Sequence, residues 1–212
     1  TPFSGGVNAL CWERQLPGDF AEVVRALGVS KEVAPIVGER LETLSVSVAG
    51  RAALAVLRED QRLLREYGAA PVLNCFQTYP SEESPQIVAT DVYSFHADSA
   101  PVEADTFLCT YHGDPSEGLR NEDARRRVDI PETRARLLQQ FGGVDDAGFR
   151  EFLAENCYDL HYAPGPAAQP FSFGRGNLWR IATEWPGCPV PPCIHRAPEN
   201  RVGQEPRLLL IC

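Results

Sequence analysis

Two histidines and an aspartate are the residues of this 212-residue sequence whose types and spacing best suit chemistry. His96 and Asp98 are separated by one residue at the end of a segment rich in β-branched and aromatic side chains. Side chains two positions apart on a strand point to the same face, so this imidazole and this carboxylate can meet at one ion. His195 supplies a second imidazole, and two histidines with one carboxylate suit Fe(II), with positions left open for oxygen and a co-substrate. The sequence therefore predicts a catalytic metal site formed by His96, Asp98 and His195.

Arg207 is the second residue with a chemical signal, because it opens the last apolar segment of the chain. On a strand it shares a face with Leu209 and Ile211, which places a guanidinium on an apolar side. A charge in such a place is costly unless an anion pairs with it. A dicarboxylate co-substrate supplies that anion through two parallel hydrogen bonds. We therefore expect Arg207 to bind the carboxylate of a co-substrate.

The elements expected to position these residues change in character near residue 70. Apolar residues recur at helical spacing between Asp19 and about Gly68, within 20–27 and 52–67. Short stretches rich in β-branched and aromatic residues follow, punctuated by Pro and Gly. These stretches are 72–78, 87–96, 106–111, 171–179, 181–185, 193–195 and 207–212. A helical insertion is expected at about 131–157, where Pro131 suits a first helical position.

This order of elements predicts a mainly β protein with helices, of the α+β class. We expect one domain over residues 1–212, because two domains of this chain would each be small. Its core would be a double-stranded β-helix, or cupin-like jelly roll, over 70–212, braced by helices within 1–69. In such a roll, strands far apart in the sequence lie side by side, so His195 can reach the 96–98 pair.

Composition narrows the classes of partner and compartment. The formal charge of −9 disfavours nucleic acid, and no apolar run approaches the roughly 20 residues that cross a bilayer. Seven scattered cysteines without a C-x-x-C pair fit reduced thiols, which favours the cytoplasm. The sequence contains no Met, so we expect the initiator and any targeting segment to have been removed. The expected partners are a small-molecule substrate and molecular oxygen.

Two polar residues are further candidates for contact with a bound co-substrate. Phe107, Cys109 and Tyr111 share a face of the expected strand 106–111. If that face lines the roll, the Tyr111 hydroxyl can hydrogen-bond a ligand carboxylate, and Asn74 on the preceding strand can do likewise. Either side chain can equally be an ordinary polar group satisfied within the protein.

The pattern resembles the Fe(II)/2-oxoglutarate-dependent dioxygenases, especially phytanoyl-hydroxylase-like members. These share an H-x-D pair, a distal His and an Arg about a dozen residues beyond it. The resemblance implies that His96, Asp98 and His195 bind iron and that Arg207 binds the distal carboxylate of 2-oxoglutarate, with Arg201 as the second choice. The chain also resembles the bacterial DUF1826 family, through segments 7–14, 95–98, 108–113, 176–179, 185–187 and 195–210. That likeness spans nearly the whole chain and implies no substrate.

Three alternatives stay open at the level of sequence. Cys188, Cys193 and His195 form a C-x4-C-x-H pattern that suits zinc, with Cys157 or His161 as a further ligand. The chain can be a binding module without catalysis. It can also be an iron oxygenase that does not use 2-oxoglutarate. If it is an enzyme of the resembled class, it oxidises a C–H bond of a small molecule or of an amino-acid- or peptide-derived substrate.

Overall fold

Antiparallel sheets form the centre of the protein in the computed structural model, which describes residues 2–28, 33, 35–79 and 86–212. Within these ranges the largest sheet has the order β1-β8-β3-β10-β2: Ala9–Trp12, Leu178–Ala182, Asp105–His112, Arg207–Ile211 and Val72–Phe76. A smaller sheet has the order β7-β4-β9: Phe171–Ser172, Glu117–Leu119 and Ile194–Arg196. Strands β5 (Ala124–Arg126) and β6 (Tyr162–Pro164) pair separately. The fold is therefore a mixed α+β arrangement, as expected, with antiparallel pairing throughout these sheets.

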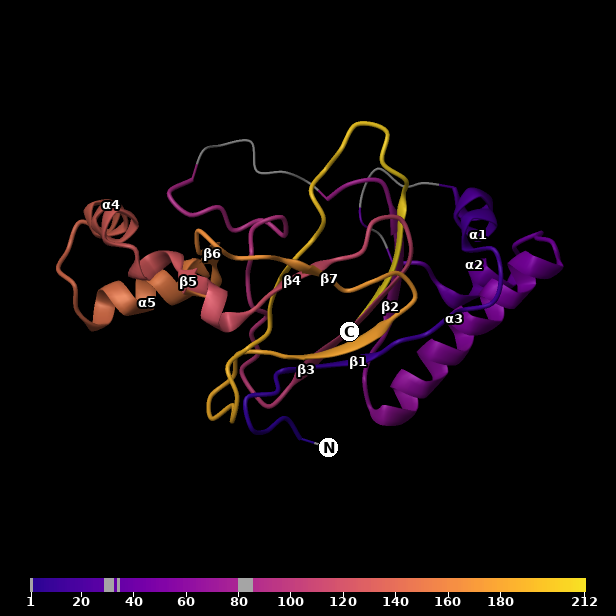
Figure 1. Cartoon of the computed structure of the whole chain (residues 1–212), viewed down its shortest axis with the longest axis horizontal. Helices are drawn as coiled ribbons and strands as arrows, with labels where there is room; N and C mark the ends of the chain where they lie inside the picture. The colour runs from indigo at the N-terminus through magenta and orange to yellow at the C-terminus, as the bar shows by residue number, and fades with distance from the viewer. Residues whose placement is uncertain (1, 29–32, 34, 80–85) are drawn as a thin grey trace.

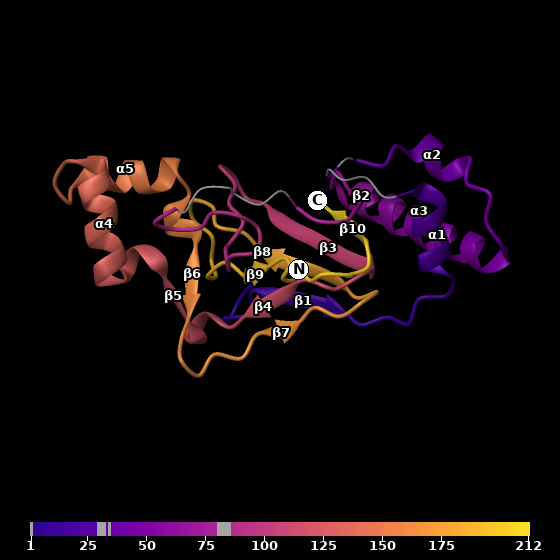
Figure 2. The same cartoon turned by 90° about the horizontal axis from the view of Figure 1, so that it is seen from above.

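The helices gather at the two ends of the molecule, with the sheets between them (Figures 1 and 2). At one end lie α1 (Phe20–Leu27), α2 (Gly38–Glu42) and α3 (Val48–Tyr67). At the other end lie α4 (Pro131–Phe141) and α5 (Ala147–Glu155), which confirm the helical insertion. Single 3₁₀ turns are η1 (Asn121–Asp123), η2 (Arg127–Asp129) and η3 (Tyr158–Leu160). In the part of the chain that the structure describes, no helix has the length and apolarity needed to span a bilayer.

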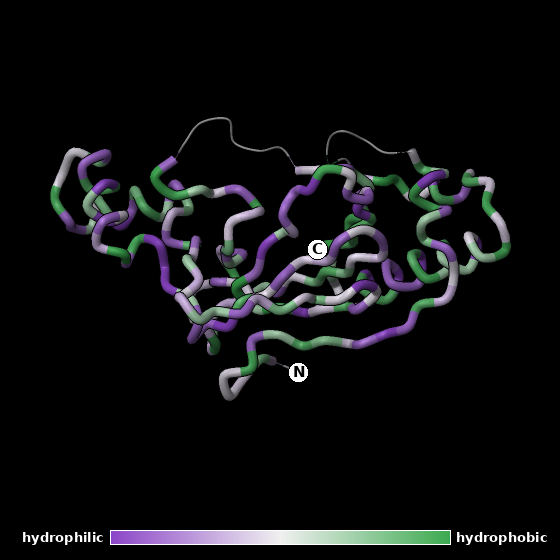
Figure 3. The backbone as a smooth tube through the Cα atoms, turned by 45° about the horizontal axis from the view of Figure 1, so that its top comes forward, coloured by the Kyte–Doolittle hydropathy of each residue, from purple (hydrophilic) through white to green (hydrophobic). Residues whose placement is uncertain are grey.

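Helix α3 is the longest helix described, and its ends follow from local sequence. The Ser47 hydroxyl accepts a hydrogen bond from the Gly50 amide at the N-terminus. Gly68 ends the helix in the left-handed conformation at φ 96°, which a residue without Cβ adopts at little cost. Hydrophobic and hydrophilic residues alternate along the helices at the two ends of the molecule (Figure 3), as elements with one buried face require. The apolar stripe of α3 includes Leu57 and packs with α1 on one face of the five-stranded sheet, beside Leu208.

Removing the N-cap of α3 gives a test of this account. We expect Ser47→Ala to lower the free energy of unfolding by about 1 kcal/mol, because the Gly50 amide loses its acceptor. Urea denaturation followed by circular dichroism measures the change. Ser4→Ala is the matched control, since Ser4 is exposed and its backbone carbonyl accepts the one bond it makes in the turn. Equal stability of the two variants would contradict this role of Ser47.

The five-stranded sheet has two buried faces. Alternate side chains of β3 divide between them, so Phe107, Cys109 and Tyr111 pack under α1 and α3. We call this the helix face. Thr106, Leu108 and Thr110 point to the opposite side, which we call the inner face. Leu108 there packs with Ile181 and Ile211 of the same sheet and with Phe173 and Cys193 beside the smaller sheet.

Three segments differ from the expectations. Residues 87–96 form turns instead of a strand, with an isolated bridge at His96, because the Asp91 carboxylate accepts bonds from the amides of Tyr93 and Ser94 and closes a turn. The expected strand 171–179 is divided into β7 and β8, since Gly174 and Gly176 adopt positive φ between them. The N-terminal region is also more than helical support: residues 9–12 form the edge strand β1.

Candidate metal centre

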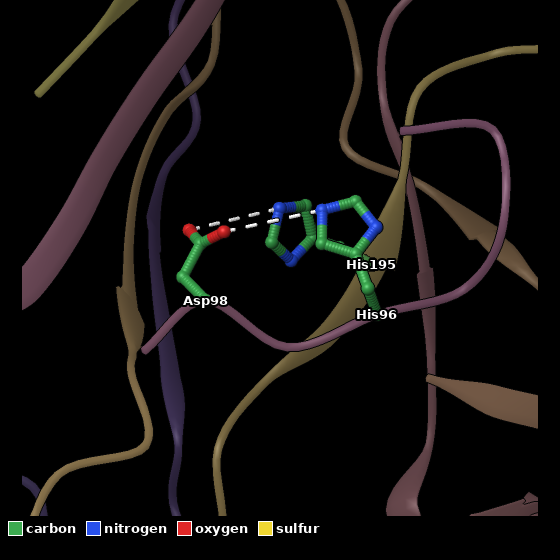
Figure 4. A group of neighbouring side chains, drawn as sticks. All are labelled: His96, Asp98 and His195. Atoms are coloured by element: carbon green, nitrogen blue, oxygen red, sulfur yellow. Dashed lines mark ion pairs between the residues drawn. The ribbon is translucent and has the colours of Figure 1, made fainter. Parts of the chain in front are cut away.

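The structure brings His96, Asp98 and His195 together, as predicted. Their ligating atoms lie within 4.8 Å of one another, and the Asp98 carboxylate faces both imidazoles (Figure 4). The Asp98 Oδ1 atom is 3.9 Å from His96 Nε2, and Oδ2 is 3.8 Å from His195 Nε2. Both separations exceed a hydrogen bond, yet two ligands each about 2.1 Å from one ion can be up to about 4.2 Å apart. This spacing suits a shared cation.

Backbone pairing fixes the two histidines side by side. The amide of His96 donates to the carbonyl of His195, and the amide of His195 donates to the carbonyl of His96, both at 2.9 Å. This mutual pair forms an isolated antiparallel bridge, and the two ring centroids are 4.6 Å apart. His195 itself lies on β9, opposite Gly118 of β4. The 99-residue separation in sequence is thus closed by main-chain hydrogen bonds.

Hydrogen bonds around the ligands direct the correct atoms inward. The Nδ1 atom of His96 lies 2.8 Å from the Ser94 carbonyl, and that of His195 lies 3.3 Å from the Cys193 carbonyl. A carbonyl only accepts, so each Nδ1 carries a proton, and in the neutral ring the Nε2 lone pair is then free on the side of Asp98. Metal-binding histidines show this arrangement in general. The residues therefore fit a metal ion on an observation independent of their sequence pattern.

Thr106 on the inner face of β3 orients the carboxylate. Its hydroxyl donates to Asp98 Oδ2 at 2.6 Å. We expect Thr106→Val, which keeps the shape of the side chain, to lower affinity for a divalent cation by about tenfold to a hundredfold. Anaerobic titration with Fe(II) against a competing chelator measures this loss. Thr183→Val is the control, because its hydroxyl donates to the Ala104 carbonyl and not to a ligand; a loss of the same size there would exclude a specific role for Thr106.

Burial sets the charge state of the site. His195 is 7% exposed, and this burial lowers its pKa, so the ring is neutral and able to bind a metal at neutral pH. Burial likewise raises the pKa of the neighbouring Cys193 thiol to about 12, which disfavours the thiolate that zinc requires. Cys188 packs in a separate apolar cluster with Phe3 and Val190. Among the described residues, neither cysteine joins the metal-ligand group.

Arg207 is a buried guanidinium of unusual environment. It is 3% exposed, and it shares the inner face with Leu209 and Ile211, as predicted from alternation. Its Nη2 atom donates to the hydroxyls of Thr110 and Ser116, whereas Nε and Nη1 have no hydrogen-bond partner. No carboxylate of the described residues forms an ion pair with it, and burial lowers its pKa. Within the described ranges, two guanidinium nitrogens therefore have no hydrogen-bond partner, in a cavity that Tyr79, Tyr93, Asp114 and Glu205 also line.

Two strands connect Arg207 with the metal ligands. Asp98 accepts a hydrogen bond from Thr106, and Arg207 donates one to Thr110. Both threonines lie on the inner face of β3, four residues or about 13 Å apart along the strand. Arg207 also donates a hydrogen bond to Ser116. Ser116 precedes Gly118 by two residues, or about 7 Å of extended chain, and Gly118 pairs with His195 across the smaller sheet. The guanidinium and the candidate metal ligands thus lie on the same side of the sheet.

The other candidate residues lie elsewhere or stay untested. Tyr111 lies on the helix face, where its hydroxyl donates to Asp60 at 2.6 Å and its ring stacks on Phe20. The expected contact of Tyr111 with a co-substrate is therefore not formed, because the helices cover the face that was expected to line the roll. Asn74 alternates with Leu73 and Cys75 of the helix face and so points to the inner side, opposite Leu209. Arg201 is exposed in the loop before β10.

His161, which the sequence offered only as a further ligand of the alternative zinc pattern, lies beside His96 of the triad. It pairs with His96 in a second isolated bridge, and the two ring centroids are 5.7 Å apart. It is 4% exposed, and burial lowers its pKa to about 4. The helical insertion separates it from His96 by 65 positions, and no local motif indicates the contact. A cavity of about 240 Å³ beside His96 and Asp98 includes His161 in its wall.

The fold and the site define an α+β protein with a candidate centre for one metal ion. Comparisons with protein-family models, with curated proteins and with solved structures find no match for this chain. The chemistry of the site itself therefore indicates the function.

Proposed function

We propose that this protein is a non-haem Fe(II)-dependent oxygenase that uses 2-oxoglutarate as co-substrate. The observation that carries the proposal is the convergence of His96, Asp98 and His195 with both Nε2 lone pairs directed at the carboxylate. Two imidazoles and one carboxylate leave open positions on Fe(II). A structural zinc site would instead be expected to have four protein ligands.

The co-substrate part of the proposal is supported by Arg207. A buried guanidinium with two unpaired nitrogens is costly by itself and suits a carboxylate held by two parallel bonds. Arg207 lies on the same side of the sheet as the candidate metal ligands, which supports a dicarboxylate co-substrate bound between them. Asn74 is a further candidate contact on the same side, and Arg201 is the weaker choice because it is exposed.

The proposal includes the jelly-roll interpretation of the fold and the resemblance to phytanoyl-hydroxylase-like dioxygenases and the DUF1826 family. Two antiparallel sheets with an apolar cluster between them support this interpretation. The metal ligands come from a bridge and a strand at one side of that cluster, as expected for the open end of a roll.

In the proposed reaction the residues of the chain bind the metal ion, orient its carboxylate ligand and shield the site from water. When bound, iron with 2-oxoglutarate supplies the oxidation of a substrate C–H bond by molecular oxygen. Asp98 and the two histidines hold the cation, and Thr106 fixes the carboxylate. The apolar neighbours of His195, with Phe173 at 6.3 Å between ring centroids, exclude water from that side. The substrate is a small molecule or is derived from an amino acid or peptide.

Metal analysis and a turnover assay on one preparation test the proposal. The protein is purified without oxygen, loaded with Fe(II), and assayed for conversion of 2-oxoglutarate to succinate with and without oxygen. We expect about one Fe(II) per chain, bound through the three ligands of the site, and oxygen-dependent succinate formation. Iron without succinate would favour an oxygenase that does not use 2-oxoglutarate. Zinc held through the thiolates of Cys188 and Cys193 would favour the zinc alternative, and no metal would favour a binding module.

A further inference from the structure

The wall of the cavity beside His96 and Asp98 includes an imidazole without hydrogen-bond partners among the residues that the structure describes. His161 lines this cavity and is 4% exposed. Its Nδ1 atom is shielded from solvent without a partner, and no group of the described residues hydrogen-bonds to its other ring nitrogen. A buried polar group left in this state costs free energy, so its presence in a cavity wall indicates a ligand that completes it.

The charges of the cavity wall are negative. The carboxylates of Asp91 and Asp98 line it, and no Lys or Arg does. One oxygen of Asp91 accepts bonds from the amides of Tyr93 and Ser94, which fixes the side chain. Its second oxygen has no hydrogen-bond partner among the residues described. A fixed carboxylate with a free oxygen binds a cationic donor well and repels an anion.

The size of the cavity restricts the ligand further. Its volume of about 240 Å³ is below the usual range for drug-sized ligands, roughly 300–1,000 Å³. Arg127 is joined to His161 through its backbone amide, but its side chain is not part of the wall. The cavity therefore suits a compact molecule with a positively charged end.

We propose that this cavity is the substrate chamber and that it selects a small aliphatic substrate with a protonated amine, bound by Asp91 and hydrogen-bonded by His161. The role of the amine as a substrate rests on the proposed oxygenase function. Binding of an amine depends only on the residues of the cavity. The cavity borders the candidate metal ligands, because His96 and Asp98 line it together with Asp91.

Binding of matched probes to the full chain tests this inference. Butylamine, butanol and butyrate have similar size and differ in charge. Each is titrated into the metal-free protein and into protein loaded with Zn(II), which is redox-inert, and NMR follows the ring signals of His161. We expect butylamine to bind most tightly and butyrate least. Asp91→Asn should weaken butylamine binding by about tenfold or more, because a charge-assisted bond becomes a neutral one.

Asp146→Asn is the matched control variant. Asp146 caps α5 by accepting bonds from the amides two and three residues onward, as Asp91 does in its turn. Asparagine keeps this acceptor in both places and removes the same charge. Butylamine binding unchanged in Asp91→Asn, or butyrate binding at least as tight as butylamine, would overturn the inference.

A second measurement needs no substitution. Cys157 lines the same cavity, and its thiol is exposed. Among the described residues it is the non-glycine residue with positive φ, at 56°. We expect butylamine, but not butyrate, to slow the alkylation of Cys157, as read by mass spectrometry. Failure to retain metal with normal amine binding would reject the oxygenase and keep the amine site. Normal metal loading without amine selectivity or protection would reject the amine site alone.

Discussion

Replacing Asp98 by alanine is expected to lower Fe(II) affinity by more than about a hundredfold. Mutating a residue that only hydrogen-bonds to a metal ligand lowers metal affinity by about tenfold to a hundredfold. Removing a ligand itself should therefore lower the affinity further. The variant also leaves the two Nε2 atoms without the negative charge that balances a divalent cation. Anaerobic titration against a competing chelator measures the affinity.

The control for this variant is Asp145→Ala, which removes the same group from an exposed ion pair with Arg134 far from the ligands. Near-native Fe(II) binding is expected there. If Asp98→Ala bound Fe(II) as tightly as Asp145→Ala did, the metal centre would have to be abandoned, together with every step built on it.

The grouping of His96 with Asp98 was predictable because alternation along a short segment is a local property, whereas the resemblance indicated His195. His96 and Asp98 are two apart, and the extended backbone around the His96 bridge is enough to place both side chains on one side. Arg207 was predictable for the same reason, since β10 keeps its guanidinium on the face of Leu209. The helices over 20–27 and 52–67 are also confirmed, because their apolar stripes and caps are local signals.

The position of Tyr111 could not be predicted, because alternation divides a strand into two faces without telling which one the helices cover. In this protein Asp60 of α3 reaches the helix face and accepts the Tyr111 hydroxyl. The contact of His161 with His96 was unpredictable for a different reason: the two residues come from parts of the chain that the insertion separates. Contacts of this kind depend on long-range packing, which a single sequence does not display.

Segment 87–96 shows how turn chemistry overrides β propensity. Its Ile87, Val88 and Val92 favour a strand. The Asp91 carboxylate instead accepts two backbone amides and bends the chain. The bend is useful to the proposed site, because the same carboxylate then faces the cavity beside His96. A local conflict between propensity and structure thus coincides with the candidate functional region.

Replacing Arg207 by methionine should separate ligand binding from folding. Truncating one partner of a buried charge pair typically costs about 2–5 kcal/mol, so the apparent requirement for 2-oxoglutarate should rise by about thirtyfold or more. Without ligand, the buried guanidinium has two nitrogens with no hydrogen-bond partner among the described residues, and methionine should leave the free energy of unfolding unchanged or higher. Succinate formation at varied 2-oxoglutarate and the rise in Tm caused by 2-oxoglutarate measure the two effects. Arg201→Met is the control, because Arg201 is exposed; an equal Tm rise in Arg207→Met and Arg201→Met would remove Arg207 from its role.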